Sequence, residues 1–325
     1  MRSPVRQAPA PRDDARHEFL ADVRRDLMLA PRQLQAKYFY DALGSQLFEA
    51  ICQLPWYHIP RAERALLGGH AEDVAAALPD LTTIVELGCG SGTKLALLVE
   101  RMRRGPVLVR LIDISATALE LSARTLGRLS QVSVVGHRAP YGPGLAAAVA
   151  RRPPQGSMLV LFLGSNIGNF HPTAAEAFLR EVRSSLRPGD GFLLGADLVK
   201  PETDLLLAYG DPIGVTAAFN KNLLDRINRE LGGDFDLDGF DHRPRWNAPA
   251  SRVESHLVSR REQTVHVRDA DLTIRFAAGE AIWTESSYKY QASGIVDMGR
   301  AAGFASRAQW IEPTARFALT LFTPA

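Results

Sequence analysis

A glycine-rich segment directly after a short apolar run is the feature that most restricts how this chain can fold. The run, residues 82–87, is rich in apolar and β-branched side chains and is typical of a buried strand. Gly88, Gly90 and Gly92 follow, and glycine lets the backbone approach a ligand closely because no side chain keeps it away. The segment therefore predicts a ligand-binding turn at the carboxyl end of a strand in an open α/β sheet.

Apolar runs and helical patterns alternate along the next hundred residues. Further strands are expected at residues 107–114, 131–135, 157–163 and 191–198, with helices at residues 94–102, 116–126 and 173–187 between them. Ser115 is expected to cap the second of these helices, and Thr173 with Glu176 forms a capping box that opens the third. This alternation predicts a parallel, doubly wound, Rossmann-like α/β sheet.

The pattern changes after Lys200. Residues 216–231 place apolar side chains at intervals of four and predict an amphipathic helix. Residues 262–267 and 272–276 alternate as antiparallel strands do. The last part of the chain is expected to return to a helix at residues 293–302 and to strands near residues 309–311 and 316–322.

These segments indicate two domains. The Rossmann-like domain is expected to comprise residues 61–199 and 289–325, and a second, α+β domain residues 18–60 and 200–288. Residues 1–17 lack the apolar segment of a secretory signal, and we expect them to form a flexible tail.

Charge and cysteine content argue against several classes of protein. The 38 lysine and arginine residues nearly balance the 36 aspartate and glutamate residues, so a net charge of +2 gives no reason to expect a nucleic-acid partner. No apolar run is long enough to span a bilayer, and two cysteines, Cys52 and Cys89, cannot form a disulfide framework. We therefore expect a cytoplasmic protein with no membrane partner.

The residues that could suggest a metal site do not fit one. Asp234–Gly239 matches the first half of a calcium-binding loop, but the twelfth position is Arg245 in place of glutamate, so we interpret the segment as a solvated acidic turn. The eight histidines show no pair at zinc-ligand spacing, and both cysteines stand alone. We expect no metal, and we interpret Cys89 as a small residue that fits the turn.

Two carboxylates beside the glycines indicate the kind of cofactor. Asp113 ends the next strand, where a carboxylate can accept hydrogen bonds from both ribose hydroxyls of an adenosine group. A dinucleotide fingerprint starting at Gly88 needs glycine or alanine at position 93, which is Thr93. Glu86, just before the turn, instead matches the E/D-x-G-x-G-x-G segment of S-adenosylmethionine-dependent methyltransferases. The expected cofactor is S-adenosylmethionine in preference to NAD.

A second turn follows the fourth strand of the series. Residues 162–172 are expected to face the ligand, because ligands of open α/β sheets bind outside the carboxyl ends of the strands. Asn169 has an amide that can both donate and accept, which suits a substrate amine or carboxylate. By position alone, a turn asparagine without a ligand is equally consistent.

Several longer motifs resemble one known family and occur in the same order. They are Lys37–Ser45, Phe162–Asn169, Gly195–Lys200, Gly214–Asn220, Asp234–Asp238, Phe276–Glu280 and Thr284–Ser287. From about residue 18 to the C-terminus, the chain resembles the S-adenosylmethionine-dependent histidine Nα-methyltransferases of ergothioneine biosynthesis, which form trimethylhistidine (hercynine). The resemblance implies a class I methyltransferase sheet with a second, substrate-binding α+β domain. It also implies methylation of the α-amino group of L-histidine, up to the trimethyl betaine.

The resemblance implies roles for individual residues. Those implied for the cofactor are Gly88, Lys94 and Asp113, and the glycine-rich segment itself adds Glu86 and Gly90. Those implied for the substrate are Tyr40, Tyr57, Asn169, Tyr209, Glu285 and Ser287. Asn169 and Tyr209 would hold the amino and carboxylate groups, and Tyr40 and Tyr57 would line the pocket near the amine. Glu285 and Ser287 would hydrogen-bond the imidazole.

Tyr40 is the residue expected to steer the amine or to receive its proton. The nucleophile is a neutral amine, and an α-amino group has a pKa of about 8, so the protein must bind and align a minority form. Tyr40, Tyr57 and Phe48 could face the cationic methylated product with π-electron density.

Three positions depart from the family pattern. His137 stands where the family usually has an aspartate, followed by an aromatic residue, to bind the adenine. Trp56 stands in the segment that the family usually reads as L-P-E-Y-Y. Ser255 stands where a methionine often packs against the imidazole, and a smaller, polar wall beside Glu285 could admit a larger or different side chain.

Alternative functions follow from these departures. The same chemistry on a tryptophan-like or arginine-like amino acid or derivative is the main alternative. A sensor that binds without turnover and a nicotinamide-dependent dehydrogenase are the others. In each methyltransferase reading the partner is a small amino-acid substrate, and we expect a monomer.

Overall fold

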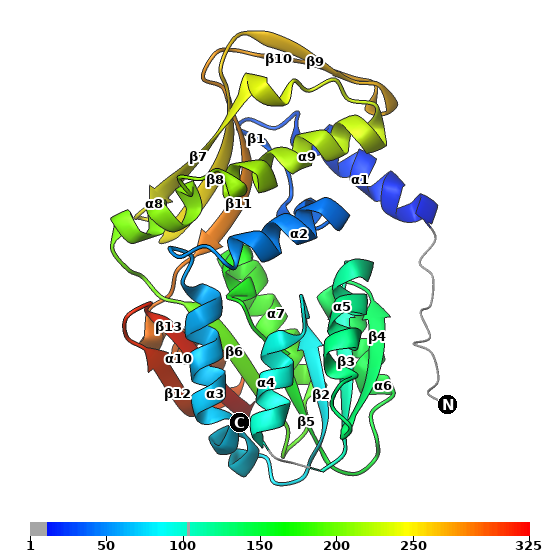
Figure 1. The fold of residues 1–325 in the computed structure, drawn as a ribbon, viewed down its shortest axis with the longest axis vertical. Helices are drawn as coiled ribbons and strands as arrows, with labels where there is room; N and C mark the ends of the chain where they lie inside the picture. Colours follow the sequence, from blue (N-terminus) through cyan, green and yellow to red (C-terminus); the bar gives the residue numbers. More distant parts are fainter. Residues whose placement is uncertain (1–11, 103–104) are drawn as a thin grey trace. The chain divides into compact units, whose positions relative to one another are not determined.

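The computed structural model describes residues 12–102 and 105–325 (Figure 1). Residues 1–11 of the predicted tail lie outside the described residues. Residues 12–17 open the helix α1 (Arg12–Asp26), so the structure corrects the end of that tail. In the described part of the chain, no helix has both the length and the apolar character needed to cross a bilayer.

The described residues form two compact units. Unit 1 comprises residues 58–199 and 289–325, and unit 2 comprises residues 12–57 and 200–288. The chain therefore passes from one unit to the other after Tyr57, after Val199 and after Tyr288.

Unit 1 is built on one seven-stranded sheet in the order β12-β13-β6-β5-β2-β3-β4. Its strands are β2 (Leu81–Leu87), β3 (Val107–Asp113), β4 (Val132–Arg138), β5 (Ser157–Phe162), β6 (Gly191–Asp197), β12 (Phe304–Glu312) and β13 (Phe317–Pro324). Strands β2 to β6 are parallel, and β13 pairs antiparallel with both β6 and β12. The predicted α/β class and its parallel strands are confirmed, and the last two strands add an antiparallel edge.

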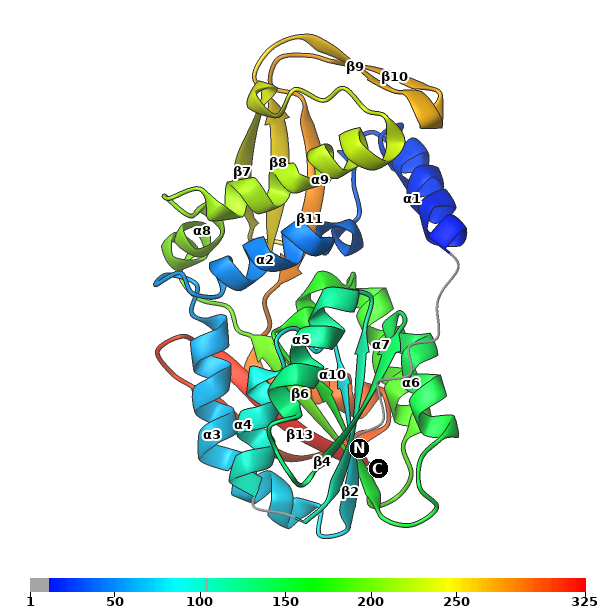
Figure 2. The ribbon, with the colours of Figure 1, turned by 45° about the vertical axis from the view of Figure 1, so that its right-hand side comes forward.

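Helices cover both faces of this sheet (Figure 2). Those on one face are α3 (Ile59–Ala77), α4 (Thr93–Met102) and α5 (Ala116–Leu126). Those on the other are α6 (Tyr141–Ala150), α7 (Pro172–Ser185) and α10 (Ala292–Ala301), whose apolar side chains share one core with β5 and β6. Burial on both faces explains why the central strands are continuously apolar.

Two helix starts test the capping predictions. Ser115 caps α5 as expected, because its side chain accepts a hydrogen bond from the N–H of Ala118. The capping box at Thr173 is wrong. α7 begins one residue earlier, at Pro172, whose fixed φ and missing N–H suit the first helical position without a side-chain cap.

The strand order places a topological switch point between β2 and β5. From β2 the chain continues to β3 and β4 on one side, whereas β5 and β6 lie on the other. The turns after β2 and β5 therefore leave the sheet next to each other at its carboxyl edge, the usual ligand-binding position of an open α/β sheet.

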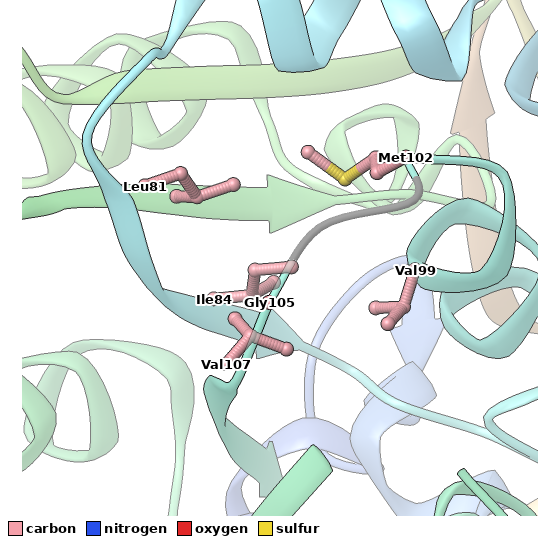
Figure 3. Close-up of a pocket in the computed structure, with 6 residues that line it drawn as sticks. All are labelled: Leu81, Ile84, Val99, Met102, Gly105 and Val107. Atoms are coloured by element: carbon pink, nitrogen blue, oxygen red, sulfur yellow. The ribbon is translucent and has the colours of Figure 1, made fainter. Parts of the chain in front are cut away.

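A small apolar pocket lies at the opposite edge of the same sheet (Figure 3). It is lined by residues of β2, α4 and β3 and by one glycine between α4 and β3: Leu81, Ile84, Val99, Met102, Val107 and Gly105. The lining carries no side chain that could hydrogen-bond or react, so this pocket is not a candidate for the chemistry.

Unit 2 combines a four-stranded sheet, a two-stranded hairpin and several helices (Figure 1). The strands are β1 (Arg32–Gln33), β7 (Phe240–Asn247), β8 (Arg252–Ser259), β9 (Gln263–Val267), β10 (Leu272–Phe276) and β11 (Ala281–Tyr288). The helices after α1 are α2 (Ala42–Ile51), α8 (Glu202–Gly210) and α9 (Val215–Leu231), with short 3-10 turns at Ala36–Phe39, Leu237–Gly239 and Arg268–Ala270. The sheet has the order β1-β11-β8-β7, and α8 and α9 pack on it.

The helix and the hairpin predicted in this unit are both present. α9 buries Phe219, Leu223, Ile227 and Leu231, the four positions expected on its apolar side. β9 and β10 pair antiparallel, with Leu272 opposite Val267. The mostly antiparallel sheet and the four helices α1, α2, α8 and α9 supply the α+β character predicted for this part of the chain.

Candidate active site

The glycine turn after β2 requires glycine at the positions that the sequence singled out. Gly88, Gly90 and Gly92 have φ values of 79°, 50° and 72°, a region that L side chains rarely adopt. A Cβ on Gly88 would lie 2.9 Å from Nδ2 of Asn166 and 3.2 Å from the hydroxyl of Tyr141. The space over this turn is therefore shared by the turns after β2, β4 and β5.

Glu86 ends β2 beneath this turn with its side chain buried. Its Oε2 has no hydrogen-bond partner within residues 12–102 and 105–325. Burial, with smaller contributions from the carboxylates of Glu63 and Asp113, raises the pKa of Glu86 to about 8, against the opposing effect of Lys94. A buried, unpaired acid is costly, and a cationic ligand group beside it would remove that cost. The site thus suits a ligand with a positive charge.

Asp113 ends β3 beside the same turn. Its Oδ1 accepts the N–H of Ser115 at 2.8 Å, and the Sγ of Cys89 lies 3.8 Å from Oδ2. Burial raises the pKa of Asp113 and, most strongly, that of the Cys89 thiol. A thiol held protonated in this way is a poor nucleophile, which supports the interpretation of Cys89 as a small packing residue.

Lys94, predicted for the cofactor, is ion-paired to a residue that the sequence analysis missed. Its Nζ donates to Oε2 of Glu63 at 2.6 Å. Glu63 lies on α3, is fully buried, and also accepts the N–H of Gly164 at 2.7 and 2.9 Å. Glu63 could have been singled out from the sequence, because it is a charged residue on the otherwise apolar face of α3. Its two partners could not have been predicted from the sequence.

His137, the remaining residue predicted for the cofactor, lies near the end of β4. It pairs with Ile112 across β4 and β3, on the sheet face opposite Asp113, and its Nε2 lies 3.4 Å from Nη1 of Arg110. Burial and then Arg110 lower the pKa of His137. Tyr141, at the start of α6, lies beside Gly88 instead.

Asn169 lies at the end of η2 (Asn166–Asn169), the 3-10 turn after β5. Its side chain is partly exposed, and within the described chain its amide has no hydrogen-bond partner. Three hydrogen bonds from outside the turn hold it. The carboxylate of Glu63 accepts the N–H of Gly164, and the N–H of Asp197 donates to Oγ of Ser165. The hydroxyl of Tyr290 donates to the carbonyl of Ile167.

Four predicted substrate residues gather in unit 2. The hydroxyl of Tyr209 donates to Oγ of Ser287 at 2.7 Å, and the rings of Tyr57 and Tyr209 meet edge to face at 6.2 Å. Burial raises the pKa of Tyr57 well above its ordinary value, and Tyr209 and Glu285 add to the shift. Tyr57 is therefore a neutral hydrogen-bonding group at physiological pH.

Ser255 lies directly opposite Glu285 in the pairing of β8 with β11. A β-bulge between Trp283 and Glu285 changes the register of β11 just before this pair. Ser255 is buried, and its Oγ has no hydrogen-bond partner in the part of the chain that the structure describes. An unpaired buried hydroxyl beside a carboxylate marks this position as polar and unsatisfied.

Tyr40 lies among aromatic rings at the start of α2. Its ring meets Phe48 at 5.6 Å and Phe219 at 5.8 Å, both edge to face. The next residue, Asp41, caps α2 by accepting the N–H of Gly44 at 2.7 Å, and it also accepts from Asn222 at 2.8 Å. These contacts fix the backbone on which Tyr40 is carried.

A family model described as histidine-specific, SAM-dependent methyltransferase matches residues 19–324. The chain belongs to this family. It is 41% identical over 312 residues to the histidine N-alpha-methyltransferase of Mycolicibacterium smegmatis, with 95% of this chain and 96% of the relative covered. It is 39% identical over 310 residues to the protein of the same description from Mycobacterium tuberculosis, with the same coverage.

A more distant relative has a different printed substrate. The chain is 26% identical over 304 residues to a 4-dimethylallyltryptophan N-methyltransferase of Epichloe festucae var. lolii, which covers 86% of this chain and 87% of the relative. The predicted membership of the histidine-specific methyltransferase family, the transferase activity and S-adenosylmethionine as cofactor are confirmed.

The glycine turn of this methyltransferase fits its cofactor by two observations. The turn leaves no room for a side chain at Gly88, and Glu86 offers a buried acid without a partner. S-adenosylmethionine carries a sulfonium and an ammonium group, and these positive charges suit the buried acid of Glu86.

The acidic turn of unit 2 is held by contacts of its own. The carboxylate of Asp234 accepts the N–H of His266 at 2.6 Å, and that of Asp236 accepts from Arg261 at 2.6 Å. Among the residues that the structure describes, no three His, Cys, Asp or Glu side chains are grouped so as to hold a metal ion.

Proposed function

We propose that this protein transfers methyl groups from S-adenosylmethionine to the α-amino nitrogen of L-histidine, up to the trimethyl betaine hercynine. Family membership sets the reaction type, and 41% identity to a histidine N-alpha-methyltransferase over 95% of the chain supports the substrate. The observation that carries the proposal is the buried Tyr209–Ser287 hydrogen bond of 2.7 Å on the strand that also bears Glu285. Hydroxyls and a carboxylate in this arrangement suit a polar amino acid.

In unit 1, the residues of the two turns take the cofactor and the amino group. S-adenosylmethionine, when bound, supplies an electrophilic methyl group. Gly88 and Gly90 give its carbon skeleton close access to the backbone, Glu86 accepts from its ammonium group, and Asp113 accepts from the ribose hydroxyls. Lys94 keeps the turn in place through Glu63. His137 is left out of this set, because its ring lies against Arg110.

In unit 2, the predicted residues bind the rest of the substrate. On substrate binding, the hydroxyl of Tyr209 turns from Ser287 to the carboxylate, and Ser287 and Glu285 then hydrogen-bond the two imidazole nitrogens. A substrate without such a side chain would leave those groups buried and unpaired, which costs affinity. Asn169 of unit 1 binds the amino group. Tyr57 of unit 2 packs edge to face on Tyr209, the residue proposed to bind the carboxylate.

The catalytic requirement is alignment of a neutral amine. An α-amino group has a pKa of about 8, so a minority is neutral at pH 7, and binding that form in line with the methyl donor is a proximity effect. Tyr40 steers the amine by accepting a hydrogen bond from its N–H, and the proton that the nitrogen loses passes to solvent water. The rings of Tyr40 and Phe48, 5.6 Å apart, present π-electron density to the quaternary product.

The second candidate is the same reaction on a tryptophan-like amino acid. The unpaired hydroxyl of Ser255, opposite Glu285, and the buried indole N–H of Trp56, which has no hydrogen-bond partner in the described chain, both change the pocket wall. The relative that is described as acting on 4-dimethylallyltryptophan shows that the larger group of relatives includes such chemistry. An arginine-like substrate is the further variant.

Mass spectrometry of the purified protein with S-adenosylmethionine and an equimolar pool of amino acids tests these candidates. We expect mono-, di- and trimethylhistidine to appear in sequence and no other product. Methylation of tryptophan or arginine in preference would establish the second candidate. No product from any amino acid would refute both. A cytoplasmic location and a monomeric state stay predictions from the sequence.

A further inference from the structure

The turn that carries Asn169 is short and depends on groups outside it. η2 follows Ser165, whose backbone is left-handed at φ 59°. The N–H of Gly168 donates to the carbonyl of Ser165 at 2.9 Å, and that of Phe170 to the carbonyl of Ile167 at 3.2 Å. A single 3-10 turn has poorer hydrogen-bond geometry than an α-helix, so its own bonds hold it weakly.

Tyr290 supplies an outside group at the centre of this turn. Its hydroxyl donates to the carbonyl oxygen of Ile167 at 3.0 Å. The ring of Tyr290 packs against the apolar core of unit 1, which fixes the hydroxyl in place. Ile167 is fully buried, so solvent is poorly placed to replace the missing donor if the hydroxyl is removed.

Tyr290 is itself held where the chain re-enters unit 1 after β11. Its N–H donates to the carbonyl of Asp197, and its carbonyl accepts the N–H of Val199, both at 3.0 Å. Lys289, the preceding residue, forms an ion pair with Asp197 at 3.0 Å, and neither side chain is more than 2% exposed. The N–H of Asp197 in turn donates to Oγ of Ser165 at 2.9 Å. The re-entry segment and the turn are thus joined at two points.

We propose that Tyr290 is a positioning residue that fixes the η2 turn, and with it the amide of Asn169, for binding the amino-acid substrate. The inference rests on the proposed function, which assigns the substrate amino group to Asn169. Removing the Tyr290 hydroxyl leaves the carbonyl of Ile167 without this donor, two residues before Asn169. Asn166 of the same turn adjoins Gly88, so cofactor affinity is expected to change, but less than amino-acid affinity.

Tyr290→Phe tests the proposal, with Tyr288→Phe as the matched control. The hydroxyl of Tyr288 accepts from Nη1 of Arg252 at 2.7 Å in unit 2, so the control also loses one hydroxyl hydrogen bond, two residues away in the chain but not on the turn. The quantities measured are kcat, the KM for the amino acid and the Kd for S-adenosylhomocysteine.

We expect Tyr290→Phe to raise the amino-acid KM about five-fold, the effect of one hydrogen bond, and to raise the Kd for S-adenosylhomocysteine by less than about two-fold. Tyr288→Phe should change neither. A purely structural role would lower thermal stability without moving the amino-acid KM, and that result would overturn the proposal. An equal loss of amino-acid and S-adenosylhomocysteine affinity would overturn it too, because it would indicate general loosening of unit 1.

Hydrogen–deuterium exchange separates this inference from the proposed function. Peptides within residues 164–170 should exchange about five-fold faster in Tyr290→Phe than in the wild type, while α3 and α4 stay the same. The measurement needs no methylation activity. Faster exchange in a protein that methylates no amino acid would leave the positioning role standing and refute the proposed function. Unchanged exchange, or faster exchange throughout unit 1, would refute the positioning role whatever the activity.

Discussion

Lys94 and Glu63 form an ion pair of 2.6 Å, and the same carboxylate accepts the N–H of Gly164. One buried acid on α3 therefore joins the helix that follows the glycine turn to the residue that opens the Asn169 turn. Gly195 on β6 makes room for it, because a Cβ there would lie 2.0 Å from Oε1 of Glu63. The arrangement links the proposed cofactor and substrate residues of unit 1 through a single side chain.

Replacement of Glu63 by glutamine should destabilise the protein. It removes the charge that compensates Lys94 inside unit 1, and breaking a buried pair costs about 3 kcal/mol. Lys94 is 26% exposed, which reduces the expected loss to about 2 kcal/mol. Urea unfolding measures it. Glu176→Gln is the control, because its pair with Arg180 is exposed and 3.6 Å long, and should cost less than about 0.5 kcal/mol. Equal midpoints for both variants would contradict the prediction.

Replacement of Gly88 by alanine should abolish most cofactor binding. The residue has φ 79°, and the added Cβ would press on Asn166 and Tyr141 from the adjoining turns. We expect the Kd for S-adenosylhomocysteine, measured by calorimetry, to rise at least about ten-fold, with strain of about 1–2 kcal/mol. Gly69→Ala is the control, since Gly69 is helical and its Cβ would meet nothing within 4 Å. An unchanged Kd in Gly88→Ala would show that the ligand binds elsewhere.

The sequence predicted the sheet of unit 1 well for a physical reason. Strands buried on both faces, such as β5, are continuously apolar, and each ends at a turn with glycine or a helix cap. In unit 2, β8 has Arg252 and Glu254 on one face and the hydroxyls of Ser255 and Ser259 among the apolar side chains of the other, so neither face is uniformly apolar. The pairing of β8 with β11 also depends on a β-bulge, which changes register without a sequence signal of its own.

The candidate site was predictable where one segment supplies the geometry and not where distant segments meet. Glycine spacing located the turn at Gly88 because backbone conformation is a local property. The partners of Lys94 come from α3 and from the turn after β5, and strand register alone decides that His137 faces Arg110. Contacts of this kind depend on tertiary packing. A family resemblance can suggest them for individual positions, but the local sequence pattern cannot predict them.

The stability of the ligand-free protein should fall as the pH rises from 5 to 8, in part because of Glu86. Burial raises the pKa of Glu86 from 4.5 to about 8, so the folded state keeps a proton that the unfolded state has lost. Unfolding then releases that proton, and the contribution of Glu86 to the free energy of unfolding decreases as the pH rises through this range. Glu86→Gln removes the effect. It should be more stable than the wild type at pH 8, by about 1 kcal/mol or more, and similar at pH 5.

Urea midpoints at pH 5, 6.5 and 8 check the prediction for Glu86. Glu120→Gln is the matched control for the substitution itself, because Glu120 is exposed on α5. A difference between Glu86→Gln and the wild type that stays constant from pH 5 to 8 would mean that Glu86 is ionised throughout.

Replacement of Ser255 by alanine should stabilise the protein and weaken histidine turnover. Its buried hydroxyl has no partner among the described residues, and an unsatisfied buried group costs about 1–3 kcal/mol, so removing it should raise the free energy of unfolding by about 1 kcal/mol. If the hydroxyl contacts the substrate beside Glu285, kcat/KM for histidine should fall several-fold.

Ser259→Ala is the matched control on the same strand. Its hydroxyl donates to the carbonyl of Arg261 at 2.8 Å and accepts from Gln263 at 2.6 Å, so this variant should lose about 1 kcal/mol or more. Equal destabilisation of both variants, measured by urea unfolding, would show that the Ser255 hydroxyl is already bonded in the folded protein, and an unchanged kcat/KM would remove it from the substrate site.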